Sequence, residues 1–202
     1  MRQLIGRFSL LLASIAALFC GIAACGSQTE TITWKEEVAL HDGRTIVVAR
    51  SVTLGGVRRE IGQGPGISKS TLSFTAPDGK QVYWENPGQL NVMLLDFEGT
   101  TPFLAGEPAM VSDYARYGCP NPSYVFFRYA NEWLRIEFKD SPSFLRKTNL
   151  LIPSKKWLAN LQNRTLQREE VDELNSDLSK HYRTIDPNRS SPDGCEKTRF
   201  VN

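Results

Sequence analysis

The sequence has little of what many enzymes and nucleic-acid-binding proteins need. It contains only two histidines, His41 and His181, and no H-E-x-x-H or G-x-S-x-G motif, so neither a zinc hydrolase nor a serine hydrolase of the usual kind is expected. The 24 Lys and Arg residues are balanced by 22 Asp and Glu residues, which argues against a nucleic-acid binder that works through bulk positive charge. We therefore expect no metal, no cofactor and no nucleic-acid partner.

Long apolar runs are also scarce, and the most apolar stretch stands at the N-terminus. Arg2 and Arg7 precede an apolar and small-residue run over 8–19. This run is short for a membrane span, but a positive start followed by a short apolar run is typical of a secretory signal. We predict that residues 1–24 are a signal peptide that is removed. The remaining chain then has 22 basic and 22 acidic residues.

The signal ends in the sequence Ile-Ala-Ala-Cys at 22–25. This ending resembles the lipobox of bacterial lipoproteins. The resemblance implies diacylglycerol on the Cys25 sulfur, cleavage before Cys25, an acylated new N-terminus and a lipidated tether over 25–30. Several acyl chains, at about 0.8 kcal/mol per buried methylene, anchor a domain where one chain does not. Gly26, in place of the Asp that retains lipoproteins in the inner membrane, points to the outer membrane. An ordinary signal peptide with a chance cysteine and an uncleaved anchor are the alternatives.

The cysteines fit this interpretation. Cys20 leaves with the signal peptide and Cys25 carries lipid, so Cys119 and Cys195 remain. Two thiols in an oxidising compartment favour a disulfide, which for a loop of this length contributes about 4 kcal/mol in the chain-entropy model. Two separate buried thiols are the alternative.

From residue 31 the pattern is that of strands joined by tight turns. Residues that tolerate a positive φ stand between apolar runs at 42–43, 78–79, 98–99 and 130–131. Such residues between two apolar runs indicate a hairpin. In the first strand, the alternation of apolar residues is broken at Glu36. We predict a mainly β fold, an antiparallel meander or small β-sandwich of about eight strands. Strand-helix-strand alternation is absent, which argues against a doubly wound nucleotide-binding fold.

The last quarter of the chain changes period. Ser154 is placed to cap a short helix, and apolar residues then recur at spacings of three and four from Val171 to Ile185, which predicts an amphipathic helix. We expect a C-terminal helical region over about 154–186, followed by a polar tail that Cys195 pins to Cys119. Residues 31–202 are thus predicted to form a single β-rich domain.

Three segments, 34–44, 118–127 and 170–175, are similar to an uncharacterised family of proteobacterial lipoproteins. The similarity runs over most of the mature chain, in order. The family has no assigned activity or catalytic residues, so the resemblance implies a location and an architecture but no mechanism.

Few residues are candidates for chemistry. The glycine-rich stretch 55–66 lacks the Gly-Lys-Ser/Thr ending of a phosphate-binding loop; it is either a plain connection between hairpins or a contact loop in which Arg58 and Arg59 bind anions. His41 is expected in a turn with Asp42, and His181 on a solvated helix face.

Acidic and aromatic residues supply two further candidates. Four acids could provide the carboxylate pair of a sugar-cleaving site, which needs a separation of roughly 5 to 9 Å, although solvated turn residues are the simpler interpretation: Asp96, Glu98, Glu107 and Asp113. Half of an aromatic group is expected in the core and half on a partner surface: Tyr114, Tyr117, Tyr124, Phe126, Phe127, Tyr129 and Trp133.

Together these patterns predict a lipid-anchored protein of the cell envelope, on the outer membrane and facing the periplasm. Its partners are the bilayer, through acylated Cys25, and another envelope protein or a glycan. A non-catalytic binding or structural role is favoured because the chemical motifs are missing. The alternative is an envelope hydrolase that cleaves glycan or peptide through paired carboxylates.

Overall fold

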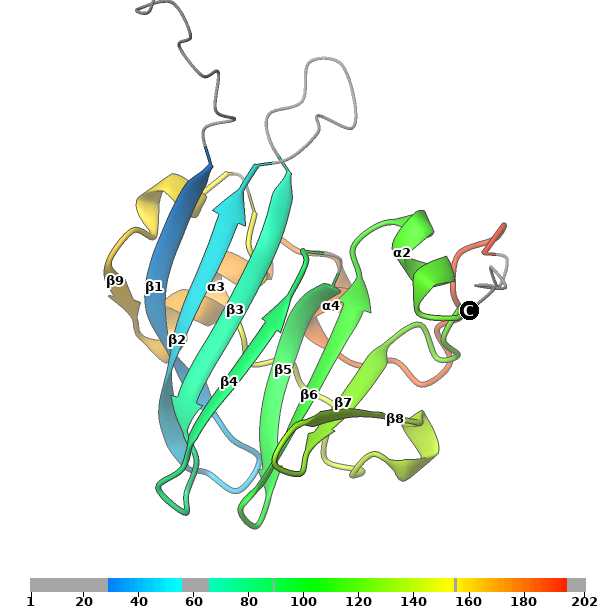
Figure 1. Cartoon of the computed structure of the whole chain (residues 1–202), viewed down its shortest axis with the longest axis horizontal. Helices are drawn as coiled ribbons and strands as arrows, with labels where there is room; N and C mark the ends of the chain where they lie inside the picture. The colour runs from blue at the N-terminus through cyan, green and yellow to red at the C-terminus, as the bar shows by residue number, and fades with distance from the viewer. Residues whose placement is uncertain (1–28, 56–65, 89, 155, 196–202) are drawn as a thin grey trace, which may run out of the picture.

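The computed structural model describes residues 29–55, 66–88, 90–154 and 156–195. Within these ranges the fold is mainly β, with nine strands in two sheets (Figure 1). The first sheet has the order β4-β3-β2-β1-β9 and consists of β1 (Glu30–Ala39), β2 (Thr45–Leu54), β3 (Ile67–Thr75), β4 (Gln81–Asn86) and β9 (Arg164–Leu166). The second sheet has the order β5-β6-β7-β8 and consists of β5 (Leu90–Glu98), β6 (Thr101–Pro108), β7 (Val125–Tyr129) and β8 (Trp133–Ile136).

The four predicted hairpins are confirmed. β1 pairs with β2, β3 with β4, β5 with β6 and β7 with β8, each antiparallel. The turn residues adopt the left-handed conformation that these tight turns require, for example Gly43 at φ 87° and Asn131 at φ 70°. Short-range turn chemistry therefore fixes each hairpin.

The two sheets separate between β4 and β5. Pro87 has no N–H to donate to a sheet ladder. Gly88 follows at φ 71°, and a Cβ there would lie 2.2 Å from the Ile67 carbonyl oxygen. Only glycine fits so close to the backbone of β3, and the chain turns here into the second sheet.

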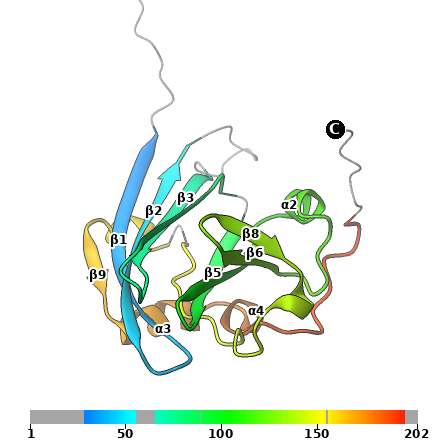
Figure 2. The same cartoon turned by 60° about the horizontal axis from the view of Figure 1, so that its bottom comes forward.

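Three apolar clusters hold the layers together. One lies between the inner face of the first sheet and the second sheet, with Val38 and Leu72 on one side and Leu95 and Leu104 on the other. A second covers the rest of the inner face with the C-terminal segment. The third covers the opposite face of the second sheet. Figure 2 shows the C-terminal segment running along the lower side of both sheets.

The predicted C-terminal helical region is only partly helical, which corrects the expectation for 154–186. It contains a 3₁₀ turn η3 (Leu158–Asn160), strand β9, and two separate helices, α3 (Arg168–Ser176) and α4 (Lys180–Arg183). β9 pairs in parallel with β1. The break between the helices has a packing reason: Val171 belongs to the cluster under the first sheet and Ile185 to the cluster on the second sheet. One straight helix could not place Val171 and Ile185 in these two separate clusters.

Glu36, which breaks the alternation of β1, is fully buried and forms an ion pair with Arg50 of β2. Arg50 Nη1 lies 2.7 Å from Glu36 Oε1, which also accepts a hydrogen bond from the Leu151 N–H at 3.2 Å. The Trp34 indole N–H donates to Glu36 Oε2 at 2.8 Å. This polar cluster lies within the inner face of the first sheet and ties it to the C-terminal segment. The described residues include no helix with the length and apolar character needed to cross a bilayer.

Candidate functional site

Three predicted site residues, Cys25, Arg58 and Arg59, lie outside the described residues. The strands next to them are described. β1 begins at Glu30, which lies opposite Leu54 at the end of β2, and Leu54 lies opposite Ile67 at the start of β3. The chain therefore enters the first sheet from the Cys25 side at the same end at which β2 leads into the 56–65 segment (Figure 1).

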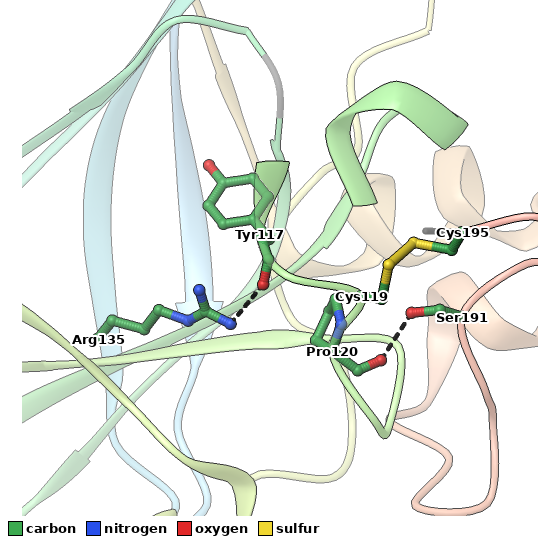
Figure 3. Close-up of a disulfide and its surroundings, with 6 residues drawn as sticks. All are labelled: Tyr117, Cys119, Pro120, Arg135, Ser191 and Cys195. Carbon is green, nitrogen blue, oxygen red and sulfur yellow. Dashed lines mark hydrogen bonds between the residues drawn. A yellow bond between two sulfur atoms is a disulfide. The ribbon is translucent and has the colours of Figure 1, made fainter. Parts of the chain in front are cut away.

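Cys119 and Cys195 are joined by a disulfide, as expected, with their Cα atoms 5.9 Å apart (Figure 3). The tail is held at further points beside this bond. The Ser191 hydroxyl donates to the Pro120 carbonyl at 2.7 Å, and the Ser123 N–H donates to the carbonyl of Arg189 at 2.8 Å. Between Arg189 and Cys195 the polar tail is thus fixed against the segment that precedes β7.

The segment that receives the tail is itself braced by the second sheet. It follows α2 (Val111–Arg116), a short helix. Arg135 of β8 donates from Nη2 to the carbonyl oxygen of Tyr117 at 2.7 Å, and its guanidinium lies 5.8 Å from the centre of the Tyr117 ring (Figure 3). The contacts join the disulfide loop to an edge strand.

The aromatic group predicted to be half partner surface contributes to the core. Tyr114, Tyr124 and Phe126 are buried. The remaining members are partly buried and pack against the cluster between the sheets: Tyr117, Phe127, Tyr129 and Trp133. About half of the group is thus in the core as expected, and the partner surface predicted for the other half stays a prediction, since these side chains pack against the core but remain partly exposed.

The candidate carboxylates are not arranged as a catalytic pair along the β5-β6 hairpin. Glu107 lies opposite Asn91, whereas Asp96 lies opposite Phe103. The two acids are therefore five positions apart along β5, about 16 Å at the usual rise, which exceeds the separation that glycoside hydrolysis needs. Glu98 is exposed beside the hairpin turn, and Asp113 is buried in α2.

His41 lies in the predicted turn, but its partner is Asp96 and not its neighbour Asp42. His41 Nδ1 is 2.8 Å from Asp96 Oδ1, and the His41 backbone N–H donates to Oδ2 at 3.0 Å. The imidazole stacks on Phe144 with ring centres 3.7 Å apart, while Asp42 pairs with Arg44. These contacts join the first hairpin to β5, a long-range pairing that no local pattern indicates.

Glu107 is the centre of a buried polar cluster that includes the tail. It is 1% exposed. Its Oε1 accepts hydrogen bonds from the Tyr114 hydroxyl at 2.5 Å and from Arg189 Nε at 3.0 Å, and forms an ion pair with Arg189 Nη2 at 2.8 Å. His181 Nε2 lies 3.7 Å from Oε2, so His181 faces this carboxylate; the expectation of a solvated helix face is wrong. The carboxylate of Glu107 on β6 thus binds both α2, through Tyr114, and the tail, through Arg189. We call this set of contacts the clasp.

The surroundings of Glu107 shift two pKa values. Burial, with the Glu107 carboxylate as a second cause, raises the pKa of Tyr114 well above its usual value. Burial also lowers the pKa of His181, although the negative charge of Glu107 opposes this shift. Both side chains are therefore neutral near pH 7, and Arg189 supplies the compensating positive charge.

The outer face of the first sheet is the one broad sheet surface that no apolar cluster of the described residues covers. Trp34, Arg50 and Leu72 point inward and are buried, so the residues between them point outward. The outward residues are mostly hydroxyl-bearing: Thr31, Thr33, Ser51, Thr53, Thr71, Ser73 and Thr75. Figure 1 shows α3 behind this sheet, with the outer face toward the viewer.

This outer face is hollowed. A trough of about 510 Å³ crosses its central strands, within the usual volume range of ligand sites. Residues of β1, β2, β3 and the β9 edge line it, among them Lys35, Ala49, Ser51, Thr71, Ser73 and Thr165. The small side chains at the centre form the floor, and Lys35 stands along one side. We call this hollow the hydroxyl trough.

In the described ranges, no group of three or more His, Cys, Asp or Glu side chains is placed to hold a metal ion. Comparison of the chain with known protein families, curated proteins and solved structures finds no match.

Proposed function

We propose that this protein is a lipid-anchored binding domain of the bacterial envelope, held on the periplasmic side of the outer membrane by acylated Cys25. The observation that carries the proposal is a hydroxyl-lined, hollowed sheet face left open on a domain whose second sheet has an apolar cluster packed on each face. A signal and lipobox pattern immediately before this domain supplies the anchor.

The length of the tether limits where the open face can act. Glu30, at the start of β1, follows Cys25 by five positions, a stretch that spans at most about 18 Å. Lys35, in the hydroxyl trough, lies five residues further along β1, about 17 Å at the usual strand rise. The trough is therefore held within about 35 Å of the bilayer surface, and its ligand must be found in that layer.

A binding role fits the described side chains better than hydrolysis does. Asp96 is engaged by His41, and one oxygen of Glu107 is engaged by Tyr114 and Arg189. About 16 Å separates the two acids along the strand. These contacts stabilise the fold, whereas an acid-base pair must reach one substrate bond from both sides. The hydrolase alternative is therefore not favoured.

Site-specific crosslinking in intact cells tests the proposal. A photoreactive amino acid is placed at Ser73, in the hydroxyl trough, and at Lys139, an exposed position elsewhere, as the matched control. We expect an adduct from Ser73 that is absent from Lys139. Cys25→Ala should release the protein from the membrane fraction and abolish the adduct. Equal labelling at both positions, or normal membrane fractionation of Cys25→Ala, would contradict the proposal.

A further inference from the structure

The strand register arranges the open face as a grid. Lys35 lies opposite Ala49, Ala49 opposite Ser73, and Ser73 opposite Tyr83. Residues that are directly opposite place their side chains on the same face of a sheet, about 5 Å apart. A row thus crosses four strands, from a lysine on β1 to a tyrosine on β4, with two small side chains between them. The neighbouring row is Thr33, Ser51, Thr71 and Glu85.

The two ends of the first row differ in chemistry. Tyr83 is 54% exposed, and its carbonyl accepts a hydrogen bond from the Trp133 indole at 2.8 Å, so the second sheet holds this edge in place. At the other end, Lys35 is exposed and has no ion-pair partner among the described residues. On β9, Thr165 lies opposite Lys35, whereas Arg164 lies opposite the inward-facing Trp34. The row therefore runs from an aromatic ring to a single lysine.

The middle of the face is built for hydrogen bonding to hydroxyl groups. The Ser51 and Thr71 hydroxyls, which line the trough, are 2.7 Å apart, and those of Thr31 and Thr53, beside it at the start of β1 and the end of β2, are 3.0 Å apart. Each pair shares one hydrogen and leaves one donor and further lone pairs for a ligand. Their mutual bonds fix the rotamers before a ligand arrives.

The nearby acids among the described residues are bound elsewhere and form no ion pair with Lys35. Glu37, two residues further along β1 on the same face, is half-buried and accepts a hydrogen bond from the Arg168 N–H at 3.3 Å. Glu85 accepts hydrogen bonds from the Tyr83 hydroxyl and from Lys69 at the far side of the sheet. Glu170 is paired with Arg164. The positive charge of Lys35 therefore faces the solvent above the hydroxyl trough, and a negatively charged group of a ligand complements it.

From this arrangement we infer that the hydroxyl trough binds an acidic oligosaccharide, a short glycan that bears carboxylate groups. The inference rests on the proposed function and names its ligand class. The row is about 14 Å wide at the usual strand spacing, enough for a few sugar rings. One ring stacks on Tyr83, ring hydroxyls bond to Ser73 and the row of Ser51 and Thr71, and a carboxylate pairs with Lys35.

A protein partner is a poorer fit to this face. The cores of protein interfaces are enriched in aromatic residues, Met and Arg, and are depleted in Ser and Lys. The face instead consists of Ser and Thr around a polar hollow, with Val47 as the exposed large aliphatic side chain of β1 to β4. Glycans present hydroxyls and the apolar faces of rings, the groups that this surface complements.

The test measures binding of a uronic acid hexasaccharide to the full mature protein, purified in detergent micelles, by isothermal titration calorimetry. An uncharged hexasaccharide of glucose is the ligand control. Lys35→Gln and Tyr83→Ala should each weaken binding of the acidic ligand about tenfold or more, and the exposed-lysine control Lys139→Gln should leave it unchanged. Both altered side chains are exposed, so thermal unfolding should be unchanged and serves as the control for folding.

Each result decides the inference. No binding of the acidic hexasaccharide, equal binding of the uncharged one, or equal affinity for Lys35→Gln and Lys139→Gln would overturn it. If the Ser73 adduct in cells contains a protein, the ligand is a protein partner and the inference of a glycan is overturned. The lipid anchor and the ligand class are tested separately. A purified chain without acyl groups that binds the acidic hexasaccharide would refute only the anchor. An acylated chain that does not bind it would refute only the ligand class.

Discussion

The buried pair of Glu36 and Arg50 gives the sharpest stability prediction. Arg50→Met keeps the length of the side chain and its packing on Trp34 but removes the charge that faces the fully buried carboxylate. A buried ion that loses its partner costs about 3–5 kcal/mol. Since a domain of this size is stable by roughly 5–15 kcal/mol, this is a large fraction of the total.

The reverse change, Glu36→Gln, should cost a comparable amount because it leaves Arg50 as an uncompensated buried cation. The double variant Glu36→Gln/Arg50→Met removes both charges, and an amide oxygen remains to accept from Trp34 or Leu151. It should therefore lose only about 1–2 kcal/mol, near the cost of one imperfect buried hydrogen bond. The two single changes are thus expected to be strongly non-additive.

Urea denaturation followed by far-ultraviolet circular dichroism measures all four proteins, with the disulfide kept oxidised. The single variants should also melt about 10 °C lower, at 2–4 °C per kcal/mol for a chain of this length. Lys139→Gln is an exposed control and should unfold like the parent. Single variants within 1 kcal/mol of the parent, or a double variant that loses the sum of the two, would refute the argument that Glu36 and Arg50 compensate each other.

Three further changes have defined outcomes. Cys119→Ser/Cys195→Ser should lower the unfolding free energy by about 4 kcal/mol, measured by urea denaturation, and an unchanged midpoint would show that the tail needs no disulfide. Because the pKa of His181 is lowered from 6.5 by burial, the unfolded chain binds more protons below that pH, so stability falls on acidification; His181→Gln should flatten this part of a melting-temperature profile, and an identical profile would contradict the assignment. Gly88→Ala should destabilise the domain by about 1–3 kcal/mol because of its positive φ and the nearby backbone; a melting temperature equal to that of the parent would refute the steric argument.

The hairpins were predictable because their signals are local. Residues at 42–43, 78–79, 98–99 and 130–131 set the turn geometry within a few positions, and the apolar runs on either side set the pairing. The disulfide was also accessible, because only Cys119 and Cys195 remain when the cysteines at the signal are assigned. The charge of Glu36 within an apolar alternation was a usable signal as well: a charge on the inner face of a strand needs a partner.

The long-range features were not predictable from the same patterns. The pairing of His41 with Asp96 and the clasp of Arg189 on Glu107 join positions that are 55 and 82 residues apart. β9 is three residues long, too short for a periodicity to be recognised, and it forms because β1 offers a free edge. The hydroxyl trough needed the register of four strands, since a Ser or Thr on an exposed strand position is by itself an ordinary surface residue.

The most direct test of the anchored domain is the intact mass of the protein purified from bacterial membranes without reduction. The account predicts a chain that begins at Cys25, with the mass of residues 25–202 plus a diacylglyceryl group and an amide-linked acyl chain, less two hydrogens for the disulfide. An unmodified polypeptide mass, or a chain that retains residues 1–24, would contradict the anchor on which the proposed function depends.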